Sequence, residues 1–169
     1  KINLAENTNG YEISTYFQLT QRGSNLTKIK LDITKHENEP VLLPTEKRPI
    51  IHLYSDELES EIQAYSLEEI VAEKIRSLFQ RTRPRDLYDT WFLWNKINIK
   101  EVIGILPEKF RLKEVEYNLE EFQKRRENYE NSWKNSLNHQ INPLPDFEEA
   151  YEAVYNNLDK LNKRWLNDS

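Results

Sequence analysis

The pattern of apolar and polar positions changes period once along the chain, close to residue 66. Before that point, residues 11–20 and 26–34 alternate apolar with polar side chains, and Gln-Arg-Gly-Ser-Asn separates the two runs. Alternation with a period of two is typical of half-buried strands, so these runs predict a hairpin. Short runs at about 50–54 and 61–65 predict two further strands that extend the same sheet.

Helical spacing dominates the rest of the chain. Ser66 stands three residues before Glu69, which is the spacing of a capping box, so a first amphipathic helix begins there. It ends before Pro84, because the residue preceding a proline avoids helical geometry. A second helix begins at Pro84 itself, where proline suits the first turn. Since this helix is apolar nearly all round, we expect it to be central, with Asp86 and Asp89 at the wall of the core.

Two longer amphipathic patterns follow at residues 118–138 and 146–166, joined by Asn-Pro-Leu-Pro. Each keeps its aliphatic and aromatic side chains in one stripe, which predicts an antiparallel helical hairpin packed on the rest of the molecule. The resulting fold class is α+β, with part of a small mixed or antiparallel sheet packed against helices. We expect a partial sheet in residues 1–65, motif-bearing helices in 66–106 and the helical hairpin in 107–169.

The composition is that of a globular domain with an acidic balance. The chain has 169 residues and a net charge of −5, and its four Trp, nine Tyr and six Phe supply a large packing area. Cysteine is absent, which excludes a disulfide framework and a thiolate metal site. No apolar run is long enough to span a membrane and no signal-like amino end is present, so we expect a cytoplasmic protein. Methionine is absent even at position 1, which predicts that the chain lacks its amino-terminal part.

Charged side chains interrupt the apolar stripe of the first helix. Lys74 falls within the stripe, and Arg81, seven residues later, projects from the same side. A buried lysine is costly unless it is paired or faces a polar cleft, so a site or a buried ion pair is implied. Four arginines stand within ten residues with no acidic residue among them, namely Arg76, Arg81, Arg83 and Arg85. Such a basic patch on an acidic protein suits a phosphate-bearing ligand, and a solvated basic turn is the alternative.

A carboxylate on the polar side of the second strand adds to this set. By itself, Asp32 is most simply a solvated strand residue. The alternative is a mixed site of carboxylates and cations, formed by Asp32, Lys74, Arg81, Asp86 and Asp89. Carboxylates bind Mg²⁺, while lysine and arginine bind triphosphate oxygens during in-line transfer, so this set favours nucleotidyl or phosphoryl transfer. The chain has no Gly-Lys-Ser/Thr loop, no nucleophile-elbow serine and no zinc-binding His-Glu-x-x-His, which excludes those three classes of enzyme.

Two stretches, residues 28–34 and 65–94, resemble the nucleotidyltransferase-type AbiEii/AbiGii toxin family. Its members show a strand with a single Asp, a helix of the form E-x-x-A-x-K-x-R-x-L, an arginine-rich turn and R-D-x-x-D. This chain has the same order over roughly residues 10–97, and more loosely over the helical remainder, although Ser77 stands where alanine is common. The resemblance implies a polymerase-β-like minimal nucleotidyltransferase core followed by a helical domain.

The resemblance also implies roles for single residues. Asp32 matches the third metal-associated carboxylate of the fold, and Lys74 matches a lysine that contacts the nucleotide triphosphate. Either Asp86 or Asp89 matches the carboxylate of the last motif. The weaker matches, which contact phosphate or pair with a neighbouring carboxylate, are Arg76, Arg81 and Arg85.

The activity that the resemblance implies is transfer of a nucleotide from an NTP to an acceptor, either an RNA such as tRNA or a protein hydroxyl. It would use Mg²⁺, and a cognate antitoxin is the implied partner. Enzymes of this type also need a glycine-rich strand-to-helix turn and an Asp-x-Asp pair upstream, and neither occurs in this chain. We therefore expect the chain to be the carboxyl-terminal portion of a longer protein and to be inactive by itself.

Two other classes of function remain open. In the first, the arginine-rich turn and the helical hairpin dock RNA or a partner protein without any chemistry, which a Lys74–Asp86 pair away from any cleft would support. In the second, Asp86, Asp89 and the arginines form an ion-pair network that fixes one helix against another.

Overall fold

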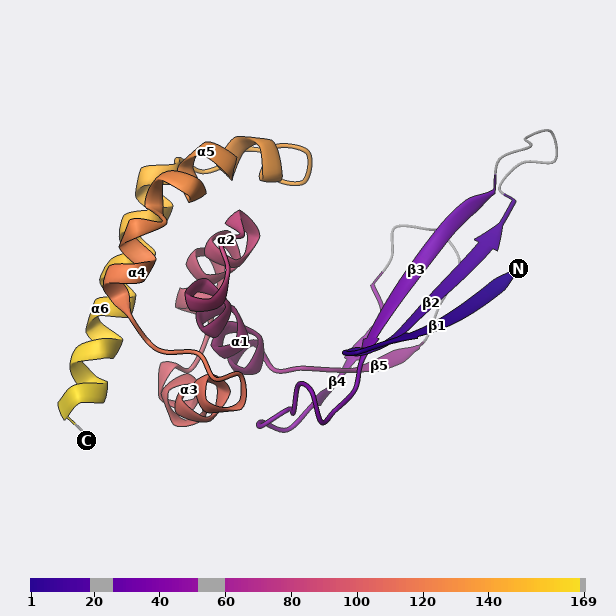
Figure 1. The fold of residues 1–169 in the computed structure, drawn as a ribbon, viewed down its shortest axis with the longest axis horizontal. Coiled ribbons are helices and arrows are strands. Elements are labelled where there is room, and N and C mark those ends of the chain that lie inside the picture. The colour runs from indigo at the N-terminus through magenta and orange to yellow at the C-terminus, as the bar shows by residue number, and fades with distance from the viewer. Residues whose placement is uncertain (19–25, 52–59, 168–169) are drawn as a thin grey trace. The chain divides into compact units, whose positions relative to one another are not determined.

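The computed structural model describes residues 1–18, 26–51 and 60–167, with side chains of the last helix described up to residue 163 (Figure 1). Contacts within the chain divide it into two units, Lys1–Val41 and Leu42–Ser169. The first unit is all β, and the second combines a two-stranded sheet with helices. The α+β fold class predicted from the sequence is therefore confirmed.

The first unit is a three-stranded antiparallel sheet in the order β1 (Ile2–Asn7), β2 (Gly10–Phe17) and β3 (Thr27–Thr34). The pairing of β2 with β3 confirms the two predicted strands, whereas the turn expected between them lies outside the described residues. β1 is not predicted by the pattern, because its short run Ile-Asn-Leu-Ala-Glu-Asn alternates only weakly. Glu12 pairs directly across the sheet with Asp32.

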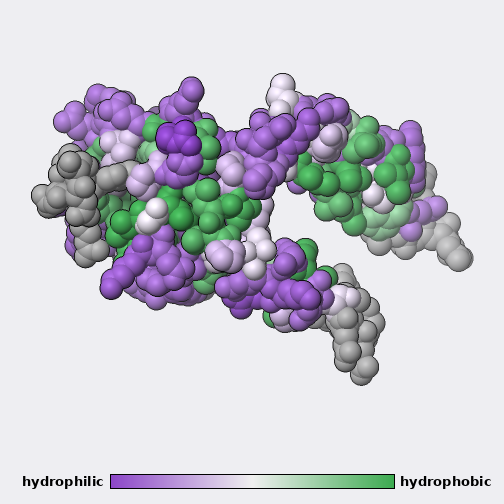
Figure 2. Space-filling model, turned by 90° about the horizontal axis from the view of Figure 1, so that it is seen from below, coloured by the Kyte–Doolittle hydropathy of each residue, from purple (hydrophilic) through white to green (hydrophobic). Residues whose placement is uncertain are grey.

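The two faces of this sheet differ in character, as the alternation of β3 predicts. Ile29, Leu31 and Ile33 project to one face and remain exposed, and exposed apolar residues of β1 lie in register with that face. Figure 2 shows this apolar surface as a green patch on the three-stranded sheet. The opposite face is polar and carries the ion-paired Lys30 and Asp32.

The second unit begins with a separate two-stranded antiparallel sheet, β4 (Glu46–Pro49) and β5 (Glu61–Ala64). The prediction that these strands extend the first sheet is wrong, because within the described residues β4 and β5 form a two-stranded sheet of their own. β4 also lies before the predicted strand at 50–54, of which residues 52–54 fall outside the described residues. Its sequence, Glu-Lys-Arg-Pro, is polar and exposed, so backbone pairing and not side-chain burial defines the strand.

The motif-bearing helices are α1 (Leu67–Gln80) and α2 (Pro84–Leu93). Their predicted starts are confirmed, because the Ser66 hydroxyl accepts the N–H of Glu69 at 3.1 Å and Pro84 opens α2. α1 packs against α2 and α3 (Ile99–Leu112), while a short 3₁₀ turn, η1 (Trp94–Lys96), follows α2.

α2 packs against α1, α5 (Arg126–Leu137) and α6 (Phe147–Asn167), which confirms its expected central position. One side of the helix is nevertheless open to solvent, since Phe92 is exposed. Asp86 is buried on the side that faces α1, as its predicted place at the wall of the core requires.

The carboxyl-terminal helices are α4 (Leu119–Lys124), α5 (Arg126–Leu137) and α6 (Phe147–Asn167). The single helix predicted over 118–138 is wrong in one respect, because it is broken at Arg125, whose N–H turns back to the carbonyls of α4. α4 and α5 run alongside α6 and form the expected helical hairpin (Figure 1).

Aromatic contacts hold this hairpin together and confirm that its aromatic stripe is core. The rings of Phe122 and Tyr151 stack at 5.3 Å, and those of Trp133 and Phe147 meet at 5.6 Å. The Trp133 indole also donates to the Pro145 carbonyl at 3.1 Å, which ties α5 to the connection before α6. None of the helices in the described part of the chain is long and apolar enough to cross a membrane.

Candidate functional site

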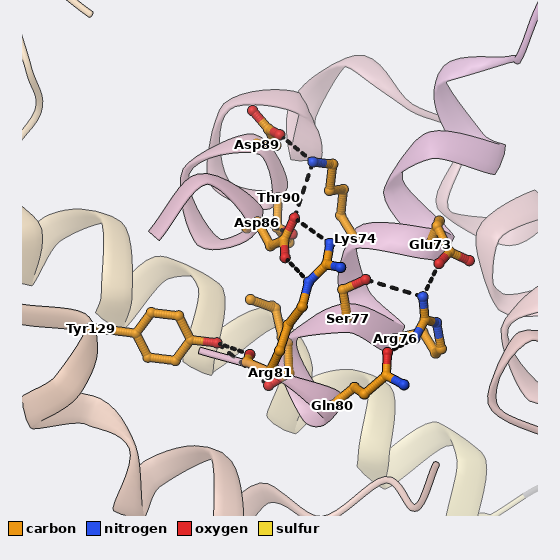
Figure 3. A network of polar contacts seen from close by, with 11 residues as sticks. Glu73, Lys74, Arg76, Ser77, Gln80, Arg81, Asp86, Asp89, Thr90 and Tyr129 are labelled. Carbon is orange, nitrogen blue, oxygen red and sulfur yellow. Dashed lines mark hydrogen bonds and ion pairs between the residues drawn. The ribbon is translucent and has the colours of Figure 1, made fainter. Parts of the chain in front are cut away.

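A buried carboxylate in the first turn of α2 is the centre of the candidate site (Figure 3). Pro84 starts the helix and thereby sets Asp86 on the side that faces α1, where its side chain is only 2% exposed. Arg81 Nε donates to Asp86 Oδ2 at 2.8 Å, and Lys74 Nζ donates to Asp86 Oδ1 at 3.1 Å. The lysine and arginine that the sequence places on one side of α1 therefore meet at one carboxylate.

Lys74 bridges two carboxylates of α2. Its ammonium nitrogen lies 2.7 Å from Asp89 Oδ2 as well as 3.1 Å from Asp86 Oδ1. An ammonium group carries three N–H donors, so these contacts account for two of them. The Lys74 side chain is 27% exposed, which leaves the ammonium accessible from solvent.

The ion pairs of this cluster keep Lys74 and Asp86 in their charged forms. Burial disfavours the ammonium form, but Asp89 and then Asp86 outweigh burial and raise the pKa of Lys74 above its ordinary value. Burial likewise disfavours the Asp86 carboxylate, but Arg81 and Lys74 outweigh it and lower the pKa of Asp86. Lys74 is thus a fixed cation at neutral pH, suited to binding an anion and unsuited to acting as a base.

Arg76 lies on the other side of α1 and is buried. Its guanidinium contacts Glu73 and Gln80, and Nη2 also lies 3.2 Å from Ser77 Oγ. This geometry favours the ion-pairing alternative for Arg76 over phosphate contact. The structure thus separates Arg76 from Arg81, which approaches Asp86 from the end of α1.

Asp32 belongs to the first unit of the chain. Its side chain is 69% exposed on the polar face of β3, and Oδ1 lies 3.2 Å from Lys30 Nζ. The same ammonium lies 2.8 Å from the Glu12 carboxylate on the neighbouring strand. In residues 1–18, 26–51 and 60–163, no group of three or more His, Cys, Asp or Glu side chains is placed to hold a metal ion. The predicted metal-binding role of Asp32 stays a prediction.

A second charged contact of α1 was not predicted by the sequence. Glu69 Oε1 lies 2.5 Å from Lys109 Nζ of α3, and both side chains are buried. The Glu69 carboxylate also accepts the N–H groups of Leu42 and Leu43, whereas its part in capping α1 is the backbone N–H that it donates to the Ser66 hydroxyl. The available signal was Lys109 itself, which stands beside Phe110 and seven residues after the core residue Val102.

The remaining arginines of the basic turn point elsewhere. Arg83 and Arg85 are exposed and line a surface hollow of about 320 Å³. Its other lining residues are Pro84 at the start of α2, Ser136 near the end of α5 and His139 just beyond it. Of the arginines in this turn, Arg81 therefore contacts Asp86, whereas Arg83 and Arg85 line an open hollow.

Comparison with known proteins agrees with these motifs. The family model described as nucleotidyl transferase AbiEii toxin, type IV TA system, matches residues 2–156 of the chain. A search of curated proteins finds no match, and a search of solved structures finds none either. The matched range includes β3 with Asp32, and both motif-bearing helices.

Proposed function

Because the chain belongs to the nucleotidyl transferase AbiEii toxin family of type IV toxin–antitoxin systems, we propose that it supplies part of the site of an enzyme that transfers a nucleotide from an NTP to an acceptor. Lys74 is the catalytic cation in this proposal and contacts the triphosphate. Asp86 and Asp89 are positioning residues, since both carboxylates bind the ammonium of Lys74.

The observation that carries this proposal is the geometry of the Lys74 ammonium. Two carboxylates orient it and keep it charged, while its third N–H and its partial exposure leave room for a phosphate oxygen. Catalysis of in-line transfer at phosphorus depends mainly on positioning and on stabilising charge that develops on the phosphate oxygens. A cation that is oriented before the substrate arrives meets both requirements.

Arg81 is a further phosphate contact in this proposal. Its guanidinium is held by Asp86 at 2.8 Å but remains partly exposed, so it can share its donors with a ligand. The buried Arg76 instead supports the structure of α1 through Glu73 and Gln80.

Asp32 is the proposed ligand of Mg²⁺. Proteins bind Mg²⁺ through one or two carboxylates together with substrate phosphates, and Asp32 with its cross-strand neighbour Glu12 matches that donor set. The bound ion supplies charge neutralisation at the phosphate oxygens. Exposure of the Asp32 carboxylate is consistent with this role, because it can exchange Lys30 for a metal without unpacking a core.

The acceptor and the partner follow from the family description. We propose an RNA such as tRNA, or a protein hydroxyl, as the acceptor of the nucleotide. A cognate antitoxin is the proposed protein partner, since the family is described as one of toxins of type IV systems.

A transfer assay on the protein expressed from its complete gene tests the proposal. The protein is incubated with Mg²⁺, cellular RNA or protein, and an NTP labelled at either the α-phosphate or the γ-phosphate. Nucleotidyl transfer predicts that only the α-label reaches a macromolecule, and that Asp32→Asn abolishes the reaction while Asp159→Asn, which alters an exposed surface ion pair on α6, retains it. Transfer of the γ-label, or of no label, would contradict the proposal.

One observation favours a second candidate function. The Lys74–Asp86 distance of 3.1 Å is what an ion-pair network fixing α1 against α2 also requires. In that case Lys74 only stabilises the fold. Its replacement then lowers the melting temperature, and any loss of transfer is explained by the unfolded fraction.

A further inference from the structure

The hollow at the start of α2 differs from the Asp86 cluster in what its cations contact. Arg83 and Arg85 pair with no carboxylate in the part of the chain that the structure describes. Most other arginines in the described part of the chain do have acidic partners, namely Arg48, Arg76, Arg81, Arg111 and Arg126. Within that part, Arg125 also lacks an acidic partner, but its guanidinium donates to the backbone carbonyl of Glu121. A guanidinium without an acidic partner can bind an anion without first breaking an ion pair.

The local backbone brings these two side chains to one place. Arg83 is extended at the N-cap of α2, and the buried Pro84 between the arginines fixes the start of the helix. Both arginines remain exposed and line the same hollow with Ser136 and His139. The wall of the hollow therefore offers two guanidinium groups, a hydroxyl and an imidazole, all of which can donate hydrogen bonds.

The composition of the wall indicates which anion fits. None of the lining residues is acidic, so the hollow offers no carboxylate for the Mg²⁺ that accompanies a nucleoside triphosphate. It also lacks Trp, Tyr and Phe, on which a base would stack. What remains is recognition of phosphate oxygens without recognition of bases, which is how proteins contact a nucleic-acid backbone.

We propose that the hollow lined by Arg83, Arg85, Ser136 and His139 binds the phosphodiester backbone of an RNA strand. This inference rests on the proposed function, which names either an RNA or a protein as the acceptor of the nucleotide. It selects RNA as that acceptor. The first turn of α2 then has two roles, since Arg85 lines the hollow while the adjacent Asp86 faces α1 and holds Lys74. RNA held by Arg85 lies next to the turn that positions the catalytic cation.

Binding of a labelled single-stranded oligouridylate, measured by fluorescence anisotropy without NTP over a series of KCl concentrations, tests this proposal. The protein is expressed from its complete gene, and the test variant is Arg83→Gln/Arg85→Gln. The matched control, Arg111→Gln/Lys124→Gln, removes the same charge from exposed side chains whose partners are also exposed.

We expect the test variant to bind oligouridylate about tenfold more weakly, and the control to bind as the wild type does. The slope of log affinity against log salt should fall by about 1.4 in the test variant, because each phosphate contact to a single strand contributes about 0.7. Equal losses in both variants, or no loss in the test variant, would overturn the proposal.

Two further arms separate this proposal from its alternatives. If the hollow serves the nucleotide, the test variant raises the KM for NTP and leaves oligouridylate binding unchanged, which overturns the proposal. If it serves a phosphorylated protein, a phosphopeptide binds in place of oligouridylate, and RNA binding at this hollow is again refuted. Lys74→Gln should lower transfer by about a hundredfold or more yet retain RNA binding, so failure of the proposed function and failure of this proposal give different results.

Crosslinking gives a readout that does not depend on a substitution. RNA that contains 4-thiouridine should crosslink to the peptide that carries Ser136 and His139. Crosslinks confined to other peptides would contradict the proposed location.

Discussion

The carboxylate of Glu69 lies 2.5 Å from the ammonium of Lys109, and both side chains are buried between α1 and α3. This pair and the Lys74 cluster are both charged contacts of α1, but they differ in access to solvent. Glu69 and Lys109 are closed to any ligand, whereas Lys74 is 27% exposed. This difference in exposure indicates a structural role for the Glu69–Lys109 pair and is consistent with ligand binding at Lys74.

The buried pair should be essential for stability. Lys109→Met leaves the Glu69 carboxylate buried without its cation, so we expect a loss of about 3 to 5 kcal/mol in the free energy of unfolding. Urea unfolding followed by tryptophan fluorescence measures it. The matched control is Glu108→Gln, which breaks the exposed pair with Arg111 and should cost at most about 1 kcal/mol. Equal costs for the two variants would show that the buried pair is not intact in solution.

The hydroxyl of Tyr129 should stabilise the end of α1. It donates to the Arg81 carbonyl at 3.0 Å from a buried position on α5, so it ties α5 to the residue that caps α1. Tyr129→Phe removes this hydrogen bond and keeps the ring, and we expect a loss of about 1 kcal/mol. Thermal unfolding compared with Tyr155→Phe, which removes a hydroxyl from the half-buried Tyr155 of α6, checks the prediction. A larger loss in the Tyr155 variant would contradict it.

Acid should weaken the Asp86 cluster. The pKa of Asp86 is lower in the folded state than in the unfolded chain, so its contribution to stability is present above the unfolded pKa of about 3.9. That contribution is lost as the pH falls through the lower pKa of the folded state. We expect the stability difference between the wild type and Asp86→Asn to be constant near neutral pH and to shrink below about pH 4. Urea unfolding at several pH values measures it, and a difference that does not change with pH would refute the account.

The sequence predicts those helices and strands in which the spacing of apolar residues is regular or a capping residue marks the start. Ser66 and Pro84 set the starts of α1 and α2, and the strict alternation around Asp32 defines β3. β1 escapes prediction because its short run alternates only weakly, and β4 escapes prediction because Glu-Lys-Arg-Pro is polar and contains no apolar period. α3 is not delimited by the pattern either, since Pro107 lies inside it and the helix continues past that residue.

The candidate site is predictable as a set of residues but not as a set of contacts. The sequence places Lys74 and Arg81 on one side of a helix, and the structure brings both to Asp86. Whether a lysine in an apolar stripe is paired or free depends on the neighbouring helix, which periodicity along α1 does not reveal. For the same reason the sequence could not separate the paired Arg76 from the open Arg85.

The most direct test of the central claim compares transfer with stability in Lys74→Gln, using the protein expressed from its complete gene. We expect kcat/KM for the NTP to fall by about a hundredfold or more, because a preorganised donor to the phosphates is lost. The melting temperature should change little, since Asp86 keeps Arg81. Lys163→Gln, which alters an exposed lysine, is the control and should retain activity. Transfer at the wild-type rate, or a loss that only follows the fraction of unfolded protein, would contradict the account.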